Sequence, residues 1–182
     1  MLHITLFIII SIILVSFSWQ VLKNPKSHGF YRFFAFEAIL ALMVLNEPYW
    51  FNNPISQLQL ASWFLLILSV VFVIQALILF KKFGGSNERQ DTPENFAFEN
   101  TVNIVENGLY RFVRHPMYSS LLFLGWGAFL KNITTLNIVL VIAVTILLVI
   151  VAKIEEGENI QFFGSKYSDY MKRTKMFVPW LL

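Results

Sequence analysis

The sequence predicts an all-α membrane protein whose 182 residues form a single membrane domain, a polytopic bundle of about five transmembrane helices. Two observations support this prediction. Hydrophobic residues make up 57% of the chain and charged residues only 14%, whereas soluble domains are roughly one quarter charged. The charged residues are also concentrated between five apolar stretches, as expected for helices that lie in lipid.

The five apolar stretches cover residues 2–22, 30–45, 58–80, 117–130 and 136–152. The first and third reach the roughly 20 residues that cross a bilayer. The first has no basic segment before it, so we expect a span and not a secretory signal. At about 1.5 Å per residue the fourth is only about 21 Å long, so with the fifth it forms a hairpin that only just crosses or tilts. Five spans are preferred, with four spans and a re-entrant hairpin as the alternative.

The basic residues predict the topology, because lysine and arginine gather on the cytoplasmic side of a membrane protein. All of them except Lys131 lie after the first, third or fifth stretch or at the start of the next. We therefore expect the amino terminus outside and the carboxyl terminus in the cytoplasm. The resulting units are three N-terminal spans in residues 1–80, a cytoplasmic loop in 81–116, a helical hairpin in 117–152 and a cytoplasmic tail in 153–182.

Several classes of site and partner are not expected from this composition. The chain has no cysteine, and its three histidines, His3, His28 and His115, lie far apart, so no metal site is predicted. The net charge of +3 is explained by topology, so no nucleic-acid partner is predicted. Membrane lipids are the expected surroundings, and the oligomeric state is left open.

Two polar clusters, residues 107–118 and 155–173, are candidates for chemistry. They lie before the fourth and after the fifth stretch, and these two stretches are expected to be antiparallel neighbours. Both clusters should therefore meet at the cytoplasmic face and line one pocket.

The first cluster is suited to holding an anion and an aromatic or cationic group. Pro116 is typical of the first helical turn, which puts His115 at the helix start, where backbone N–H groups bind anions such as carboxylates. Tyr110 and Tyr118 add aromatic faces that attract a cation such as a sulfonium. Taken singly, Tyr110, Tyr118, Arg111 and Arg114 are more typical of interfacial anchors at a helix entry.

The second cluster adds negative charge and further aromatic rings. Glu155 and Glu156 can hold ribose hydroxyls or a cationic group, although paired glutamates at a helix exit are most often solvated. Beyond them, Tyr167 and Tyr170 lie in a stretch that can form an interfacial helix over the pocket.

Together the two clusters resemble a known family. The run Gly108-Leu-Tyr-Arg-Phe-Val-Arg-His-Pro-Met-Tyr118 closely resembles the Gly-x-Tyr-x-x-x-Arg-His-Pro-x-Tyr signature of the isoprenylcysteine carboxyl methyltransferase and phospholipid methyltransferase superfamily. The tail of that family is similar to the second cluster, which has Glu155-Glu156, then Phe163-Gly164, Tyr167, Tyr170, Arg173 and Pro179. The resemblance covers the chain from about residue 95 to its end.

The resemblance implies an integral membrane methyltransferase that uses S-adenosylmethionine and acts on a lipophilic or membrane-embedded acceptor, as the isoprenylcysteine enzymes do. The cofactor pocket would be formed by the cytoplasmic loop and tail. By position, the cofactor-binding residues would be Val102, Asn103, Ile104, Val105, Tyr110, His115, Pro116, Met117, Tyr118 and Glu155. The predicted catalytic residues are Glu156, as a proton acceptor, and Arg173, which falls on the family pattern.

Three positions depart from the pattern of the prenylcysteine enzymes. Val102 replaces a histidine, Val151 replaces an arginine that faces the substrate carboxylate, and Ser120 replaces a frequent glycine. These departures weigh against a prenylcysteine carboxylate as the acceptor. A phospholipid amine, or a small lipophilic thiol or carboxylate, is the alternative within the superfamily, and a non-catalytic membrane subunit or transporter is the alternative outside it.

Glu37 lies inside the second apolar stretch, where an ionisable side chain is costly and usually faces the protein interior. Two roles are considered for it: a function near the path of the acceptor, and a structural pairing with a polar residue of a neighbouring span.

Overall fold

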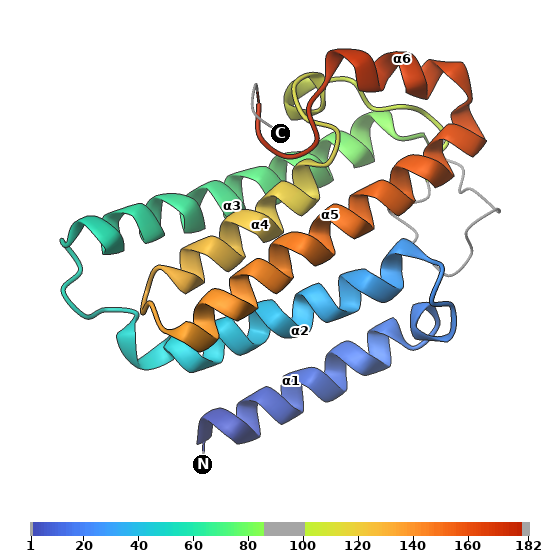
Figure 1. The fold of residues 1–182 in the computed structure, drawn as a ribbon. Coiled ribbons are helices and arrows are strands. Elements are labelled where there is room, and N and C mark those ends of the chain that lie inside the picture. The colour runs from blue at the N-terminus through green and yellow to red at the C-terminus, as the bar shows by residue number, and fades with distance from the viewer. Residues whose placement is uncertain (1, 86–100, 180–182) are drawn as a thin grey trace.

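The computed structural model describes residues 2–85 and 101–179, and its regular elements are helices. Residues 86–100 of the predicted cytoplasmic loop, and the last three residues of the tail, lie outside this description. Five helices run along the bundle and the short α6 lies at one end (Figure 1). Their bounds are α1 Leu2–Ser18, α2 His28–Asn46, α3 Gln57–Phe83, α4 Pro116–Phe129, α5 Thr135–Phe163 and α6 Ser165–Arg173. The predicted all-α class is confirmed.

Three helices are long and apolar enough to cross a bilayer. They are α2 with the short turn that follows it, His28–Tyr49, then α3 and α5, with 22, 27 and 29 residues respectively. Helices α1 and α4 have 17 and 14 residues, below the roughly 20 that a perpendicular span needs. The number of complete crossings therefore stays a prediction.

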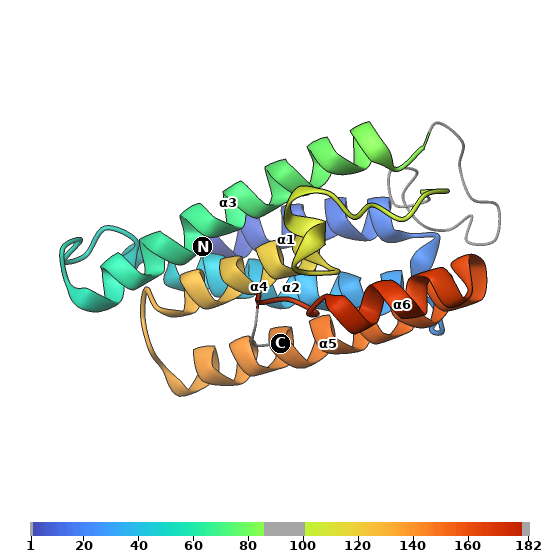
Figure 2. The same ribbon diagram turned by 90° about the horizontal axis from the view of Figure 1, so that it is seen from above.

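The helices pack side by side around an apolar core. Helix α3 lies against α4, α2 lies against α5 and α4, and α1 lies against α2 at the edge of the bundle (Figures 1 and 2). The fully buried core includes Leu42, Val144 and Leu148. The outer surface is apolar as well, with Ile67 and Ile146 more than half exposed. A bundle that is apolar both inside and outside is suited to lipid as its solvent.

Local sequence signals explain where the helices begin. The side chains of Ser27, Ser56 and Thr134 cap α2, α3 and α5 by accepting hydrogen bonds from backbone N–H groups, which are otherwise unpaired at a helix start. Helix α4 begins as predicted, with Pro116 in its first turn and His115 as the residue before it. The two motif residues are therefore held at the start of a rigid helix.

The fifth apolar stretch was expected to end at residue 152, but α5 continues to Phe163. The charged residues beyond 152 are good helix formers, so loss of apolar character does not end the helix. Gly164, with φ 65° and ψ −140°, ends it in a backbone conformation that is open almost only to glycine. Glu155 and Glu156 therefore lie on a polar extension of α5 and not beyond the end of the helix.

Charge is divided between the two ends of the bundle. Among the described residues, Lys131 is the one lysine or arginine near the α4–α5 turn, and the other lysines and arginines lie at the end that holds α6. The Lys131 ammonium donates to Gln59 Oε1 at 2.9 Å and lies 3.5 Å from the centre of the Trp63 ring. This separation supports the predicted charge asymmetry, and which end is cytoplasmic stays a prediction.

Glu37 contacts the neighbouring helix. Ser11 Oγ on α1 donates to Glu37 Oε2 on α2 at 2.7 Å. Of the two roles considered for Glu37, this contact supports structural pairing between adjacent helices.

Two glycines of α4 permit close helix packing. A Cβ at Gly127 would lie 2.9 Å from side-chain atoms of Leu66 on α3, and one at Gly125 would lie 3.1 Å from Val144 on α5. Helix α4 is therefore held between α3 and α5 at distances that a side chain would increase.

We predict that Gly127→Ala lowers the stability of the purified protein by about 1–3 kcal/mol, because overpacking a close contact forces neighbouring atoms apart. Thermal unfolding in detergent, followed by helical circular dichroism, measures the effect. Gly157→Ala is the matched control, since a Cβ there meets nothing within 4 Å, and it should be neutral or stabilising. Equal unfolding midpoints for the two variants would contradict the packing.

Candidate functional site

A pocket opens at the α6 end of the bundle. It contains about 400 Å³ of space between atoms, including its open mouth. Its walls come from α3, from the loop before α4, from α5 and from α6. The lining residues are Phe80, Thr101, Asn103, Ile104, Val105, Tyr110, Arg114, Glu155, Asn159, Phe163, Tyr167 and Tyr170.

A second pocket of about 300 Å³ adjoins the first and reaches the start of α4. Its lining residues are Phe80, Tyr110, Arg114, His115, Pro116, Met117, Tyr118 and Glu155. Because the two pockets share Phe80, Tyr110, Arg114 and Glu155, they are neighbours, and we call them together the terminal cleft.

The terminal cleft brings together nine of the ten residues predicted to bind a cofactor. Val102 is the exception, because it does not line the cleft and its backbone N–H donates to Gly84 O at 3.0 Å. The nine lining residues are Asn103, Ile104, Val105, Tyr110, His115, Pro116, Met117, Tyr118 and Glu155.

The two predicted catalytic residues lie outside this lining. The Glu156 side chain is 4% exposed and lies beneath the cleft. The Arg173 side chain is 60% exposed and pairs with Glu106 at 2.8 Å, so it joins the end of α6 to the loop before α4. What either residue does in a reaction stays a prediction.

The segment before α4 is held against α3 by a motif glycine. Gly108 has φ +58°, and a Cβ there would lie 2.8 Å from Leu79 Cδ1, so both the conformation and the space favour glycine. The Tyr110 ring stacks on Phe80 with centroids 4.9 Å apart. Tyr170 Oη donates to Tyr110 O at 2.6 Å, which closes the cleft on the α6 side.

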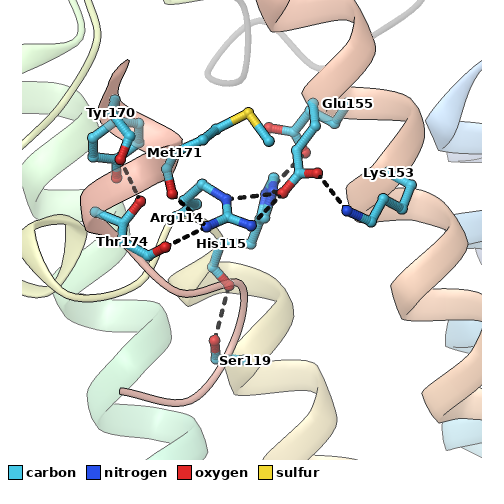
Figure 3. Close-up of polar contacts among 9 residues, drawn as sticks. Arg114, His115, Ser119, Lys153, Glu155, Tyr170, Met171 and Thr174 are labelled. Carbon is cyan, nitrogen blue, oxygen red and sulfur yellow. Dashed lines mark hydrogen bonds and ion pairs between the residues drawn. The ribbon is translucent and has the colours of Figure 1, made fainter. Parts of the chain in front are cut away.

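Arg114 is the most connected charged residue of the site. Its Nε and Nη2 atoms each lie 2.8 Å from Glu156 Oε1 on α5. Its Nη1 donates to the backbone oxygens of Thr174 and Met171 at the end of α6 (Figure 3). This one guanidinium therefore links the start of α4, the extension of α5 and the end of α6.

The backbone around Arg114 adds a second link. Residues 112–115 run beside residues 175–176 as a short parallel pairing, in which the Arg114 N–H donates to Lys175 O at 2.7 Å. Ser119 Oγ donates to Phe177 O at 2.7 Å. The end of the chain is thus tied to the motif at the start of α4.

Glu156 is held as a buried carboxylate. Burial alone would raise its pKa, but His115, Arg114 and Lys153 favour the ionised form and lower the pKa from 4.5 to about 2. His115 Nε2 lies 3.6 Å from Glu156 Oε1, too far for a hydrogen bond, so its effect is electrostatic. The direct partners are Arg114 and Lys153, whose Nζ lies 3.1 Å from Oε2.

His115 lies between two carboxylates. Its Nδ1 is 3.7 Å from Glu155 Oε2 and its Nε2 is 3.6 Å from Glu156 Oε1, and its side chain is 2% exposed. The ring stacks on Tyr118 with centroids 5.4 Å apart. A histidine that is fixed in this way can exchange a proton without moving its ring.

Two tyrosines of α6 form an uncharged wall. Burial is the main cause that raises the pKa of both Tyr167 and Tyr170 above the ordinary value of 10, so both phenols stay neutral. Both line the cleft, as the interfacial-helix interpretation of this segment predicted.

Sequence reasoning did not assign Arg114, Phe80 or Asn159 to the site. Arg114 directly precedes His115 in the recognised motif, so the sequence could have assigned it to the site. Phe80 ends an apolar stretch and looked like any lipid-facing residue. Asn159 lies four residues, about one helical turn, after Glu155 and shares its face, a signal that is usable only once α5 is known to extend so far.

An apolar groove lies on the other side of Arg114. It runs between α4 and α5 beneath the end of the chain and contains about 1080 Å³, including its open mouth. Its lining includes Leu122, Val149 and Phe177, and Arg114 forms a wall of both the groove and the terminal cleft. Lys172, Arg173 and Lys175 also line it, so the groove combines apolar walls with basic groups beside Arg114.

The apolar bundle with a polar cleft at one end defines an integral membrane protein of the all-α class. A model of the phospholipid methyltransferase family matches residues 59–166, more than half of the chain. The chain belongs to this family. The matched region begins in α3 and contains the first motif cluster and the beginning of the second, through residue 166.

Three similar proteins are named methanethiol S-methyltransferase, one of them methanethiol S-methyltransferase 1. The protein of Pseudomonas deceptionensis is 35% identical over 71 residues, which cover 39% of this chain and 26% of the relative. That of Bradyrhizobium diazoefficiens is 31% identical over 124 residues, covering 66% and 39% respectively. That of Crocosphaera subtropica is 24% identical over 174 residues, covering 89% and 64%. The chain thus spans between about a quarter and two thirds of these relatives' lengths. No solved structure matches the chain.

We predict that Arg114→Gln destabilises the protein by about 3–5 kcal/mol, because removing one partner of a buried ion pair leaves the other charge uncompensated. Thermal unfolding in detergent measures the loss. Lys172→Gln is the matched control, since its pair with Asp169 is exposed on both sides and such pairs contribute little. A loss no larger than that of the control would contradict the structural role of Arg114.

Acid should weaken the fold through Glu156. Because the pKa of Glu156 is about 2 in the folded protein and ordinarily 4.5, ionisation contributes stability that is complete above about pH 4.5 and is lost as the pH falls toward 2, on the order of 3 kcal/mol. Unfolding midpoints across that window should fall more steeply for the wild type than for Glu156→Gln. Asp169→Asn, at an exposed site, should follow the wild type, and parallel curves for Glu156→Gln and the wild type would contradict the assignment.

Proposed function

We propose that this protein is a methyltransferase that takes its methyl group from S-adenosylmethionine and transfers it to a lipophilic acceptor presented by the membrane. The observation that supports this most strongly is the convergence of the two motif clusters, far apart in sequence, on one cleft at the polar end of an apolar bundle. Family membership supports the reaction class, and the chemistry of the cleft supports the donor.

The residues of the terminal cleft fit the chemical groups of S-adenosylmethionine. Aromatic rings of Phe163, Tyr167 and Tyr110 can contact an adenine ring and attract a sulfonium. The Glu155 carboxylate, with its side chain 25% exposed, can accept hydrogen bonds from ribose hydroxyls or from an ammonium. The amides of Asn103 and Asn159 supply both donors and acceptors.

The donor's carboxylate also has a fitting partner in the cleft. The first turn of α4 has backbone N–H groups at Met117 and Tyr118 that precede its internal hydrogen bonds, and these residues line the cleft. A helix start attracts an anion through these groups and through the helix dipole. The cleft can therefore hold both the ammonium group and the carboxylate of S-adenosylmethionine.

S-adenosylmethionine supplies an electrophilic methyl group. The residues of the chain would then act mainly by alignment of the acceptor with that methyl group, since effective molarity accounts for much of the rate in such displacements. The neutral tyrosines of α6 would exclude water from the reacting atoms. The ion pair of Arg114 with Glu156 would keep the start of α4 and the extension of α5 in register.

The acceptor class follows from the groove and from the relatives. The apolar residues of the groove beside Arg114, such as Leu122, Val149 and Phe177, are suited to an acceptor that dissolves in lipid. The relatives are named for methylation of a small thiol, so a lipophilic thiol is the first class to test. An amine of a phospholipid head group is the second candidate, since the family is named for phospholipids and Glu155 can hold a cationic amine.

The position of Arg173 suggests a role at the mouth of the cleft. Its pair with Glu106 joins α6 to the loop that supplies Asn103 to Val105, so it would help to keep the cleft closed over the donor. This role replaces direct participation in catalysis in our proposal.

We expect the detergent-purified protein to bind S-adenosylmethionine and S-adenosylhomocysteine in calorimetry. Glu155→Ala should raise the Kd by roughly 10- to 100-fold, the loss expected for a hydrogen bond to a charged group. Asp169→Ala, on an exposed part of α6, is the control and should bind as the wild type does. A folded wild type that binds neither compound would overturn the proposed function.

Bound protein should then transfer a radiolabelled methyl group to a lipophilic thiol in preference to phosphatidylethanolamine. Transfer to the phospholipid alone would replace the thiol by the second candidate. Binding without transfer to any acceptor in a lipid extract would favour a non-catalytic membrane subunit.

A further inference from the structure

We propose that His115 is the group that removes the proton from a thiol acceptor, with Glu156 as the buried carboxylate that positions the imidazole. This inference rests on the proposed function and changes the role that the sequence suggested for Glu156. It concerns a step that precedes methyl transfer, because a thiol reacts as its thiolate.

The two nitrogens of His115 lie in different surroundings. Nε2 is buried, has no hydrogen-bond partner among the described residues and lies 3.6 Å from Glu156 Oε1. Nδ1 lies 3.7 Å from Glu155 Oε2, and Glu155 lines both parts of the terminal cleft. Nδ1 is therefore the nitrogen on the cleft side, and Nε2 is the nitrogen on the side of the buried carboxylate.

This arrangement favours one tautomer of the neutral imidazole. A proton on Nε2 faces the negative charge of Glu156, which leaves the lone pair of Nδ1 directed toward the cleft side. When Nδ1 gains a proton, the imidazolium lies between the two carboxylates, Glu155 and Glu156, and both stabilise its charge.

Glu156 itself is poorly suited to accept the proton. Its Oε1 receives two contacts from Arg114 and its Oε2 receives one from Lys153. Its side chain is 4% exposed and it lines neither part of the cleft. A carboxylate with both oxygens engaged and a pKa of about 2 holds a proton weakly, so it serves as a fixed negative charge.

The ring of His115 is also held in place. Its backbone N–H donates to Met176 O at 3.2 Å, and its ring packs between Tyr118 and Phe177, with centroid distances of 5.4 and 6.3 Å. The charged groups that face it are Arg114 from its own segment and Glu155 and Glu156 from α5. A base held this firmly does not turn away from the acceptor after it gains a proton.

The proton transfer balances as follows. The S–H bond of the acceptor breaks, its electron pair stays on the acceptor sulfur, and an N–H bond forms at His115 Nδ1. That sulfur then forms a bond with the methyl carbon supplied by S-adenosylmethionine, whose own sulfur keeps the electrons of the broken bond and becomes a neutral thioether. The imidazolium returns its proton to water after the products leave.

Acceptors of different acidity test this assignment. An alkanethiol is largely protonated near neutral pH and needs a base, whereas an aryl thiol is largely ionised and does not. In His115→Gln we expect kcat/KM for the alkanethiol to fall by roughly 100-fold or more, the usual effect of losing a general base. The loss in kcat/KM for the aryl thiol should be at least about ten-fold smaller than the loss for the alkanethiol, because only the deprotonation step needs the base.

Two further measurements distinguish a His115 that acts as the base from a His115 that only aligns the acceptor or binds the donor. Calorimetry of S-adenosylhomocysteine with His115→Gln reports donor binding without turnover. The pH dependence of the wild-type reaction should show an essential base for the alkanethiol that is absent for the aryl thiol. Glu156→Gln should move that dependence, whereas Asp169→Asn should not.

Each outcome decides between the possibilities. Equal losses on both thiols, or a loss of S-adenosylhomocysteine binding that accounts for the whole effect, would overturn the assignment of His115 as the base. A wild type that binds S-adenosylhomocysteine but methylates no thiol would overturn this inference and leave the methyltransferase proposal standing. A wild type that does not bind it would overturn the proposed function itself.

Discussion

The contact between Arg114 and Glu156 holds together parts of the chain that have little else in common. The guanidinium reaches from the start of α4 to the extension of α5 and to the backbone at the end of α6. Two opposite charges in a poorly solvated place attract strongly, but each is costly to bury alone. The start of α4, the extension of α5 and the end of the chain therefore adopt their positions together. The residues of the cleft are spread over all three segments, so their geometry depends on this pair.

The lipid environment gives this constraint its importance. In a soluble protein, burial of apolar faces would hold the helices together, but within a bilayer lipid chains compete equally well for those faces. Association then relies on close packing, such as that of Gly125 and Gly127, and on polar contacts between helices. The structure has such contacts at both ends. Asn137 Nδ2 donates to Asn46 Oδ1 at 2.7 Å near the α4–α5 turn, and Arg114 joins Glu156 near the cleft.

Much of the fold and of the site could be predicted from the sequence, because the signals were local. Apolar stretches of fixed length predicted the helices, and Pro116 predicted the start of α4. The two motifs, with the stretch just upstream of the first, predicted most of the cleft lining. The length of α5 could not be predicted in the same way, since the charges after Ala152 resemble a solvated tail until they are seen to face the cleft. The role of Arg114 could not be predicted from local sequence signals either, because its partners lie far away in the sequence. Val102 does not line the cleft, and its backbone N–H donates to Gly84 O, so its contact with a cofactor stays a prediction.

The difference in length between α4 and its neighbours sets the depth of the site. Helix α5 has 29 residues and α4 has 14, so at about 1.5 Å per residue their lengths differ by roughly 22 Å. The start of α4 therefore lies deeper along the bundle than the end of α5. Helices form the sides of the cleft, and its floor lies near the apolar layer. A water-soluble molecule that enters from above and a lipid-soluble one that enters from the side would meet at that floor without either one leaving its own phase. The depth at which the two molecules would meet is therefore set by the numbers of residues in α4 and α5, which the amino-acid sequence determines.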